Sequence, residues 1–257
     1  MGLLFEAPSL RTRVGFEIAT SQLGGQSVWL AEMRNSPAMD GQESFADTLR
    51  VLSGMVDLIV ARLHQPLRRS VIESHACCPV INGGDAALGH PTQAIIDLFN
   101  IRTSGIRLDS TDLIVCGDAT MRTVLSLVEM LEMFPPRSLT FVTPQARMVP
   151  DGWLGPNLRK RTQYSDSLKG VRGQVIYQCG LPAFGTEPLS VDLRAQYALS
   201  PQLVTEIGAE VVLSPLPLID EISEEMREDP RFVAFEYSDR AVWSRMAVLE
   251  QLLMDQH

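Results

Sequence analysis

The stretch LIVCGDATMRTVLSLVEMLEM, residues 113–133, combines a short apolar run, a polar turn and an amphipathic segment. Residues 113–116 are continuously apolar, which is typical of a strand buried on both faces of a parallel sheet. In residues 123–133 apolar side chains recur at spacings of three and four, which predicts a helix with one apolar face. A strand, a Gly-Asp turn and a helix in succession indicate α/β architecture.

The same alternation extends along the rest of the chain. Further apolar runs that predict strands occur at residues 56–60, 79–81, 139–142, 175–177 and 211–213. Segments with helical spacing occur at residues 12–23, 45–55, 92–101 and 241–254. A boundary is predicted near residues 103–105, because a second strand–helix alternation begins after it. The last helix follows this second alternation.

Composition excludes several classes of protein. The 257 residues include 22 Lys and Arg against 31 Asp and Glu, a net charge of −9 that is the opposite of a typical nucleic-acid binder. No apolar run reaches the roughly 18 residues that a membrane helix needs. The start has no basic region of the kind that precedes the apolar part of a signal peptide. We therefore expect a soluble, cytoplasmic protein with no nucleic-acid or membrane partner.

Cysteine usage argues against a structural metal site. None of the four cysteines forms a CxxC pair, and two of them, Cys77 and Cys78, are adjacent. Structural zinc sites need spaced pairs, and adjacent cysteines rarely bridge each other. We expect buried, reduced thiols.

The first polar segment of interest is Ser9-Leu10-Arg11-Thr12-Arg13, which opens a predicted helix. Ser9 suits the N-cap position, and the N–H groups of a first helical turn have no internal partner. Hydroxyls and a guanidinium at such a terminus can bind an anion. From these residues alone, a plain N-cap with surface arginines is the stronger interpretation.

The second segment, NGGDAALGHPTQ at residues 82–93, follows the strand predicted at 79–81. His90 precedes Pro91 at a helix start, where proline is well tolerated. Gln93 lies about one helical turn further, so both side chains can face one point. An imidazole and an amide can each donate to a carbonyl oxygen. The alternative is a helix cap with a structural histidine.

The third segment is Gly117-Asp118 with Arg122, at the end of the strand quoted above. In doubly wound sheets this position lines a ligand crevice. The segment is not GxGxxG, so a dinucleotide is not indicated. Arg122 can bind a carboxylate, although without other support a surface arginine is the stronger interpretation.

Taken together and in order, these segments resemble the aspartate/ornithine carbamoyltransferase family, nearest to its aspartate carbamoyltransferases. Phe5-Glu6 with residues 9–13 is similar to the family's F-E-x-S-T-R-T-R, and residues 82–93 are similar to its N-x-G-D…H-P-T-Q. Residues 117–123 are similar to G-D…R-T-V, and SPLPLIDEI at residues 214–222 is similar to H-P-L-P-R-x-D-E-I. The resemblance covers nearly the whole chain.

The resemblance implies two doubly wound parallel-sheet domains. Residues 1–103 would bind carbamoyl phosphate and residues 104–237 the acceptor, with a C-terminal helix at 238–257 that packs back on the first domain. It also implies a homotrimeric transferase that acts on two small molecules, carbamoyl phosphate and an amine. This chemistry requires no metal or organic cofactor.

The implied site residues form two groups. Carbamoyl phosphate would be bound by Ser9, Leu10, Arg11, Thr12, Arg62, His90 and Gln93. Among these, His90, Arg62 and Gln93 are the implied catalytic residues, because the leaving phosphate needs its charge neutralised and the tetrahedral transition state needs donors at its oxygen. The acceptor would be bound by Arg122, Gly180, Leu216 and Pro217.

Several positions depart from the family pattern. Leu10 replaces a threonine of the phosphate segment, and Gly180 stands near the place of an acceptor-binding arginine. Ser214 and Leu218 replace the His and the Arg of H-P-L-P-R. The family's mobile-loop lysine has no counterpart in residues 36–48. The family also has a helix and most of a strand before the first motif, so either the start is truncated or the first domain is remodelled.

Three functional hypotheses follow. The first is a carbamoyltransferase whose amine acceptor is small and amino-acid-like but is not aspartate. The second is a family member repurposed for another substrate or reaction in specialised metabolism. The third is a non-catalytic homologue. The retained phosphate and carbamoyl residues rank the first hypothesis highest.

Overall fold

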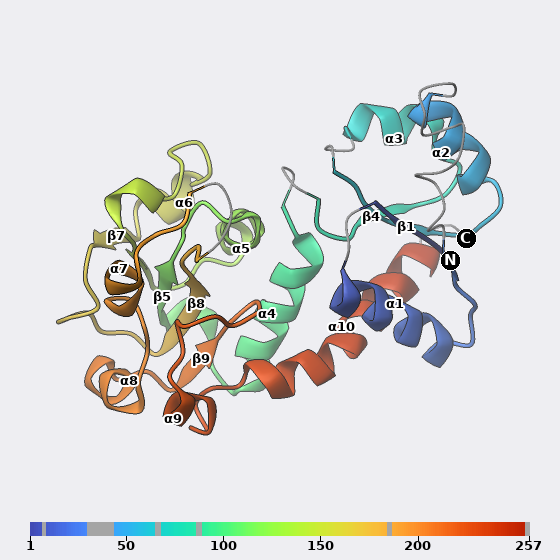
Figure 1. Ribbon diagram of the computed structural model, residues 1–257. Coiled ribbons are helices and arrows are strands. Elements are labelled where there is room, and N and C mark those ends of the chain that lie inside the picture. Colours follow the sequence, from blue (N-terminus) through green and yellow to red (C-terminus); the bar gives the residue numbers. More distant parts are fainter. Residues whose placement is uncertain (7–8, 30–43, 65–67, 86–88, 184–186, 255–257) are drawn as a thin grey trace. The chain divides into compact units, whose positions relative to one another are not determined.

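The computed structural model describes residues 1–6, 9–29, 44–64, 68–85, 89–183 and 187–254. The chain divides into two compact units, one formed by Met1–Thr92 with Asp239–His257 and the other by Gln93–Ser238. Each unit holds a parallel sheet with helices on its faces (Figure 1), which confirms the predicted α/β fold with two doubly wound sheets. The predicted boundary at residue 103 and the division at Thr92 lie at opposite ends of helix α4 (Pro91–Thr103).

The sheet of the first unit has the strand order β2-β1-β3-β4, and all its pairs are parallel. Its strands are β1 (Gly2–Phe5), β2 (Val28–Trp29), β3 (Ile59–Arg62) and β4 (Val80–Asn82). One face packs on helices α1 (Leu10–Gln22) and α10 (Ala234–Met254), with Leu249 of α10 against Leu3 and Phe16. The opposite face packs on α2 (Phe45–Ser53) and α3 (Arg69–His75) (Figure 1).

The sheet of the second unit has the order β7-β6-β5-β8-β9, again with parallel pairs. Its strands are β5 (Asp112–Gly117), β6 (Ser138–Val142), β7 (Thr162–Ser165), β8 (Val175–Gly180) and β9 (Val211–Leu213). Its helices after α4 are α5 (Arg122–Met133), α6 (Pro156–Arg159), α7 (Val191–Ala195), α8 (Pro201–Ile207) and α9 (Glu224–Arg227). Single 3-10 turns occur at Leu108–Ser110 and Gln145–Arg147.

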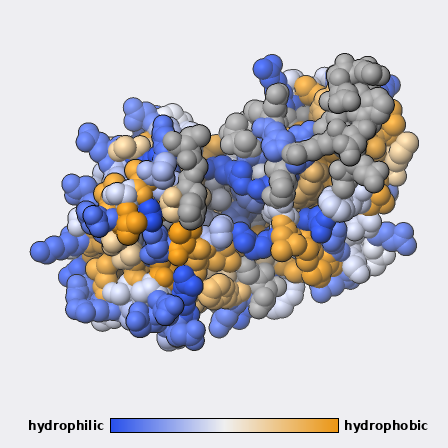
Figure 2. Space-filling model, in the orientation of Figure 1, coloured by the Kyte–Doolittle hydropathy of each residue, from blue (hydrophilic) through white to orange (hydrophobic). Residues whose placement is uncertain are grey.

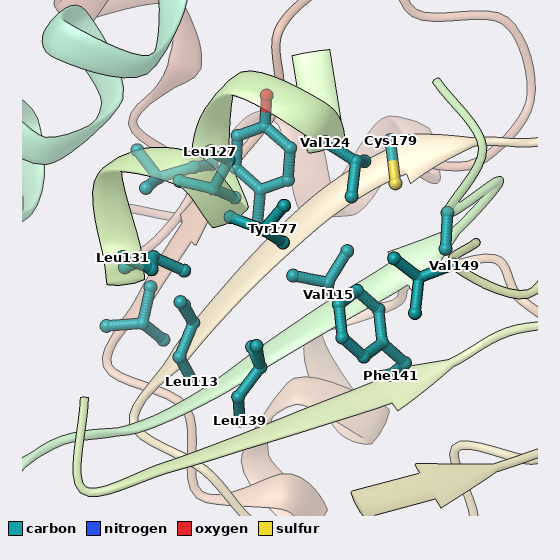
Figure 3. Packing of buried hydrophobic residues seen from close by; sticks show 14 of the residues in the cluster. Leu113, Val115, Val124, Leu127, Leu131, Leu139, Phe141, Val149, Tyr177 and Cys179 are labelled. Atoms are coloured by element: carbon teal, nitrogen blue, oxygen red, sulfur yellow. The ribbon is translucent and has the colours of Figure 1, made fainter. Parts of the chain in front are cut away.

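Strand β5 explains why its sequence is apolar without alternation. Leu113 and Val115 point into a core shared with α5, where Leu127 and Leu131 pack beside them (Figure 3). Ile114 packs on the other face of the sheet, against residues of α8 and α9. Both faces of the strand are buried, so every position of the run is apolar.

Each sheet reverses its winding direction at one pair of strands. In the first sheet the chain passes from β1 to one edge at β2 and then to the other side at β3. In the second sheet it runs from β5 outward to β7 and then crosses to β8. In open α/β sheets, ligands bind outside the carboxyl ends of the strands at such a reversal. The expected ligand-binding positions are therefore the carboxyl ends of β1 and β3, and those of β5 and β8.

The surface carries no broad apolar band on the face shown in Figure 2, where hydrophilic and hydrophobic residues are interspersed. Among the helices of the described residues, none is both long and apolar enough to span a membrane.

Candidate functional site

The site of the first unit is built on the carboxyl ends of three neighbouring strands. Strand β1 ends at Phe5, β3 at Arg62 and β4 at Asn82. Parallel pairing places these ends at one edge of the sheet, and the segments that follow them carry most of the predicted phosphate and carbamoyl residues. The first reversal of the winding thus coincides with these residues.

The segment after β1 opens helix α1, as predicted, although the helix begins at Leu10 rather than at residue 12. Ser9 occupies the N-cap position, as predicted, but its hydroxyl makes no capping hydrogen bond. Arg11 is exposed and Thr12 is buried. Leu10 is 72% exposed and has no side-chain donor, so it can offer an anion only its backbone N–H.

Arg62 ends strand β3 and contacts the loop that follows β4. Its Nη1 donates to the carbonyl oxygen of Gly83 at 3.3 Å. Gly83 is itself tied to the sheet, because its N–H donates to Ala61 O at 2.7 Å. Arg62 thus places a guanidinium group at the strand ends where the winding of the sheet reverses. Helix α1 begins after β1, and its N-terminus carries partial positive charge as well.

Asn82 organises the turn that precedes the histidine. Its Oδ1 accepts hydrogen bonds from the N–H of Gly84 at 2.7 Å and of Asp85 at 3.0 Å. Gly84 has a φ of +99°, and a Cβ on it would lie 2.6 Å from Cδ2 of His90. Only glycine lets the backbone pass so close to the ring. The residues of N-x-G-D therefore shape the surface on which His90 rests.

His90 is held in one orientation by its neighbours. Its ring is buried, and Nδ1 lies 3.2 Å from the Thr92 hydroxyl. When that hydroxyl donates to Nδ1, the neutral imidazole carries its proton on Nε2. In this tautomer His90 is a hydrogen-bond donor for a carbonyl oxygen, which is the role the sequence predicted.

Gln93 lies in the first turn of α4 and is the first residue of the second unit. Its Nε2 donates to Oδ1 of Asp97 at 2.9 Å. Asp97 is buried, and burial raises the pKa of its carboxyl to about 7. Asp97 was not among the predicted site residues, although a carboxylate four positions after Gln93 in the same predicted helix was a visible signal.

The ends of β5 and β8 approach each other too closely for side chains. Gly117 has a φ of +108°, and a Cβ on it would overlap Gly180 O and lie 2.8 Å from Gly180 N. Gly180 has a φ of +69°, and a Cβ there would lie 3.1 Å from Cδ of Glu221. The predicted acceptor residue Gly180 thus contributes only backbone to the edge of the sheet and lies close against the Glu221 side chain.

Two buried carboxylates flank this edge. Glu221 Oε2 accepts from the N–H groups of Ile219 and Asp220, at 2.9 and 3.0 Å. Asp118 Oδ1 accepts from the backbone N–H and the hydroxyl of Thr120, at 2.9 and 2.6 Å. One guanidinium nitrogen of Arg147 lies 4.0 Å from Asp118. Asp118 and Glu221 both occur in the sequence motifs described above, but neither was among the predicted acceptor-binding residues.

Cys179 adjoins the same edge and is not a nucleophile. Burial raises the pKa of its thiol well above the ordinary value, and Cys116, Asp118 and Glu221 raise it further. Its Sγ donates to the carbonyl oxygen of Cys116 at 2.9 Å. A protonated, hydrogen-bonded thiol of this kind is inert.

The remaining acceptor residues lie in loops and at a helix start. Leu216 has a φ of +54°, a conformation that non-glycine residues adopt at a cost of about 1–3 kcal/mol and that is concentrated at functional sites. Pro217 is exposed beside it. Arg122 begins helix α5 and is half-buried. The part of the lysine-free loop at residues 36–43 lies outside the described residues.

Comparison with known proteins identifies the family. A family profile described as "Aspartate/ornithine carbamoyltransferase, carbamoyl-P binding domain" matches residues 1–103. An aspartate carbamoyltransferase catalytic subunit from Chromobacterium violaceum is 33% identical, over 97% of this chain and 84% of the relative. The corresponding protein from Methanosarcina acetivorans is 36% identical, over 97% of this chain and 82% of its own.

Solved structures show the same architecture. The catalytic subunit of M. jannaschii aspartate transcarbamoylase superposes with a TM-score of 0.87 at 29% identity, over 99% of this chain and 85% of that one. Aspartate transcarbamoylase from Trypanosoma cruzi in complex with carbamoyl phosphate gives a TM-score of 0.84 at 28% identity, over 97% and 82%. An ornithine carbamoyltransferase from Burkholderia thailandensis, 20% identical, shares the fold with a TM-score of 0.81 over 98% and 84%.

Proposed function

Because the chain belongs to the aspartate/ornithine carbamoyltransferase family, we propose that it transfers a carbamoyl group from carbamoyl phosphate to an amine of a small, amino-acid-like acceptor other than aspartate. The observation that carries the proposal is the arrangement of His90. Its ring rests on Gly84, and its Nδ1 faces Thr92. The loop that supports it is also bonded to Arg62.

The phosphate end of the substrate requires positive charge and N–H donors. Arg62 and Arg11 supply guanidinium groups, which can hold an oxyanion with two parallel hydrogen bonds. The first turn of α1 adds backbone N–H groups, and Ser9 and Thr12 add hydroxyls. Neutralising the phosphate lets it leave as the bond between the carbamoyl carbon and the phosphate oxygen breaks.

The carbamoyl end requires one donor and one acceptor. His90 donates from Nε2 to the carbonyl oxygen, which becomes negative when the acceptor amine attacks carbon. Gln93 presents its amide to the carbamoyl NH₂. The new C–N bond forms first, and the tetrahedral species then collapses as the bond to phosphate breaks. The proton lost by the amine leaves with phosphate or solvent. Holding the two reactants in this geometry supplies much of the rate enhancement.

The acceptor end is where the proposal departs from aspartate. A second carboxylate on the acceptor would meet Gly180, which has no side chain, beside the carboxylates of Glu221 and Asp118. Like charges in a half-buried site repel. A neutral or cationic group suits this edge better, while Arg122 remains to hold the α-carboxylate of an amino acid.

The proposal also assigns roles to the parts of the chain. Residues 1–103 would bind carbamoyl phosphate and residues 104–237 the acceptor, with the helix of residues 238–257 returning to the first domain. The assembly would be a homotrimer, as the family resemblance implies. Sedimentation of the purified protein checks this, since a trimer has three times the mass of the 28.4 kDa chain.

The test of function is release of phosphate from carbamoyl phosphate. The protein is incubated with carbamoyl phosphate and a panel that contains aspartate, neutral amino acids and amino acids with a second amine. We expect phosphate release and a carbamoylated product with a neutral or cationic acceptor, and slower turnover with aspartate. Turnover of aspartate at about 1–10³ s⁻¹, with no better acceptor, would contradict the choice of acceptor.

Binding distinguishes the two alternative hypotheses. If no amine is carbamoylated, carbamoyl phosphate and inorganic phosphate are compared by thermal shift. A ligand at 100 times its dissociation constant stabilises the folded state by about 2.7 kcal/mol. Stabilisation by carbamoyl phosphate without turnover points to a non-catalytic homologue, and stabilisation by phosphate alone points to a different phosphorylated substrate.

A further inference from the structure

A cluster of buried polar side chains lies beside Gln93 within the second unit. Gln93 and Asp97 come from helix α4, Tyr177 from β8 and Thr123 from α5. The Tyr177 ring belongs to the apolar core, but its hydroxyl points out of that core (Figure 3). This hydroxyl faces Asp97 and Thr123, and its interaction with the Asp97 carboxyl opposes the effect of burial on the pKa of that carboxyl.

Most of the polar side-chain atoms of this cluster lack a hydrogen-bond partner of ordinary geometry. Oδ2 of Asp97, the hydroxyl of Tyr177 and the hydroxyl of Thr123 have no hydrogen-bond partner of ordinary geometry. The contact that is made joins Gln93 Nε2 to Asp97 Oδ1 at 2.9 Å. Buried polar groups are rarely left without partners, because the hydrogen bonds they lose to water are then not replaced. A cluster retained under this penalty at the predicted carbamoyl residue invites a functional explanation.

The direction of the single contact has a chemical consequence. A carboxylate accepts hydrogen bonds and cannot donate, so an ionised Asp97 binds only the NH₂ end of the Gln93 amide. That leaves Oε1 of Gln93 as the end that can face a substrate. A carbamoyl group has N–H donors on one side and a carbonyl oxygen on the other, and His90 already serves the oxygen. Gln93 can bind the carbamoyl NH₂ only if it presents an acceptor, which is its Oε1.

We propose that Asp97 is a positioning residue, which holds the Gln93 amide so that Oε1 accepts a hydrogen bond from the NH₂ of the carbamoyl group. The inference rests on the proposed function for the identity of the ligand. Asp97 touches no reacting atom and acts only through Gln93.

The protonation of Asp97 controls the orientation that it enforces. When protonated, the carboxyl can donate to Oε1, and the amide is then stable in the reversed orientation, with its NH₂ facing the carbamoyl NH₂. Burial raises the pKa of Asp97 to about 7, so the productive, ionised form gains population as the pH rises through 7. The groups that face Asp97 are Gln93 on its own helix and Tyr177 on β8, and Tyr177 in turn faces Thr123 and Cys179. Burial raises the pKa of both Tyr177 and Cys179, so both stay neutral in this range.

The kinetic test compares the pH profiles of wild type and Asp97→Asn. Asparagine keeps the size of the side chain but can bind either end of the Gln93 amide, and it does not titrate. We expect kcat/KM for carbamoyl phosphate to fall about tenfold at pH 8, the effect of one lost hydrogen bond of about 1.4 kcal/mol. We also expect the step near pH 7 to disappear. Titrations of the acceptor and the phosphate are common to both proteins and cancel in the ratio.

A double-mutant cycle tests whether Asp97 acts through Gln93. In the Gln93→Ala background, Asp97→Asn is expected to cause no further loss. Asn100→Ala is the matched control, because Asn100 is a buried polar residue of the same helix. It is expected to leave the pH step in place. An unchanged effect of Asp97→Asn in the Gln93→Ala background would overturn the proposal.

One readout does not depend on activity and so separates this inference from the proposed function. The side-chain NH₂ signal of Gln93, identified by its loss in Gln93→Ala, is followed by NMR in glutamine-labelled protein. Its shift is expected to change between pH 6 and pH 8 in wild type and to stay constant in Asp97→Asn. If the chemical shift of the Gln93 NH₂ does not change with pH in either protein, the positioning role of Asp97 is overturned, even if the enzyme is active.

Discussion

Replacement of His90 by alanine is expected to lower kcat for carbamoyl transfer by about 10²–10³-fold, the usual effect of removing one donor to a developing oxyanion. The ring is buried against Gly84, and when the Thr92 hydroxyl donates to Nδ1, the neutral imidazole has Nε2 as its donor. Alanine has no donor, so the negative oxygen of the transition state loses its stabilisation. KM for carbamoyl phosphate is expected to change much less, because the phosphate is held by other residues. Steady-state phosphate release measures both constants.

His75→Ala is the matched control for this substitution. His75 is a half-buried histidine of helix α3 whose Nδ1 lies 3.1 Å from Val71 O. Its removal also takes away a ring and one hydrogen bond, but His75 ends helix α3 and does not belong to the segments that follow the strand ends. Activity of His75→Ala is expected to stay within twofold of wild type. Equal losses in the two variants would show that His90 acts through stability alone.

Gly117→Ala is expected to destabilise the second unit by about 2–5 kcal/mol. The left-handed conformation at φ +108° costs an alanine about 1–2 kcal/mol, and overpacking of a tight core costs about 1–3 kcal/mol more. The added Cβ would overlap backbone atoms of Gly180, which cannot rotate away as a side chain can. Urea denaturation measures the change in the free energy of unfolding.

Gly208→Ala separates the two causes. Gly208 has a φ of +81°, at the end of helix α8 in the same unit, and a Cβ on it would meet no atom within 4 Å. It should therefore lose only the conformational part, about 1–2 kcal/mol. A loss in Gly117→Ala no larger than in this control would mean that the ends of β5 and β8 can separate freely.

Long apolar elements were predictable because a strand that is buried on both faces of a sheet has a continuous run of apolar residues in its sequence. The strand predicted at residues 113–116 is confirmed within β5, and the helix predicted at 123–133 is confirmed as α5. Strands β2 and β7, at one edge of each sheet, were missed, whereas β4 and β9 at the opposite edges were predicted. Strand β7 has the sequence TQYS and is partly exposed, so no apolar run marks it. Strand β2 has only two residues, both exposed.

Buried polar residues were the other class that pattern reading missed. Gln178 is fully buried in β8, where its Nε2 donates to Tyr197 O at 2.7 Å. Arg245 on α10 is buried with its guanidinium over Phe16 and against Gly15, and burial lowers its pKa to about 10. Each looks like a surface residue in sequence, because its partners are distant in the chain.

Sequence alone determined the α/β class and located the segments that carry His90, Gln93 and the residues proposed to bind phosphate. Repeated short-range patterns record burial and turn chemistry, and both act locally along the chain. Only the tertiary structure decided that the Tyr177 hydroxyl faces the Asp97 carboxyl, and that Gly180 lies between Gly117 and the Glu221 carboxylate. These contacts join residues brought together by sheet order, and the energies of burial and close approach depend on neighbours that the sequence does not place side by side.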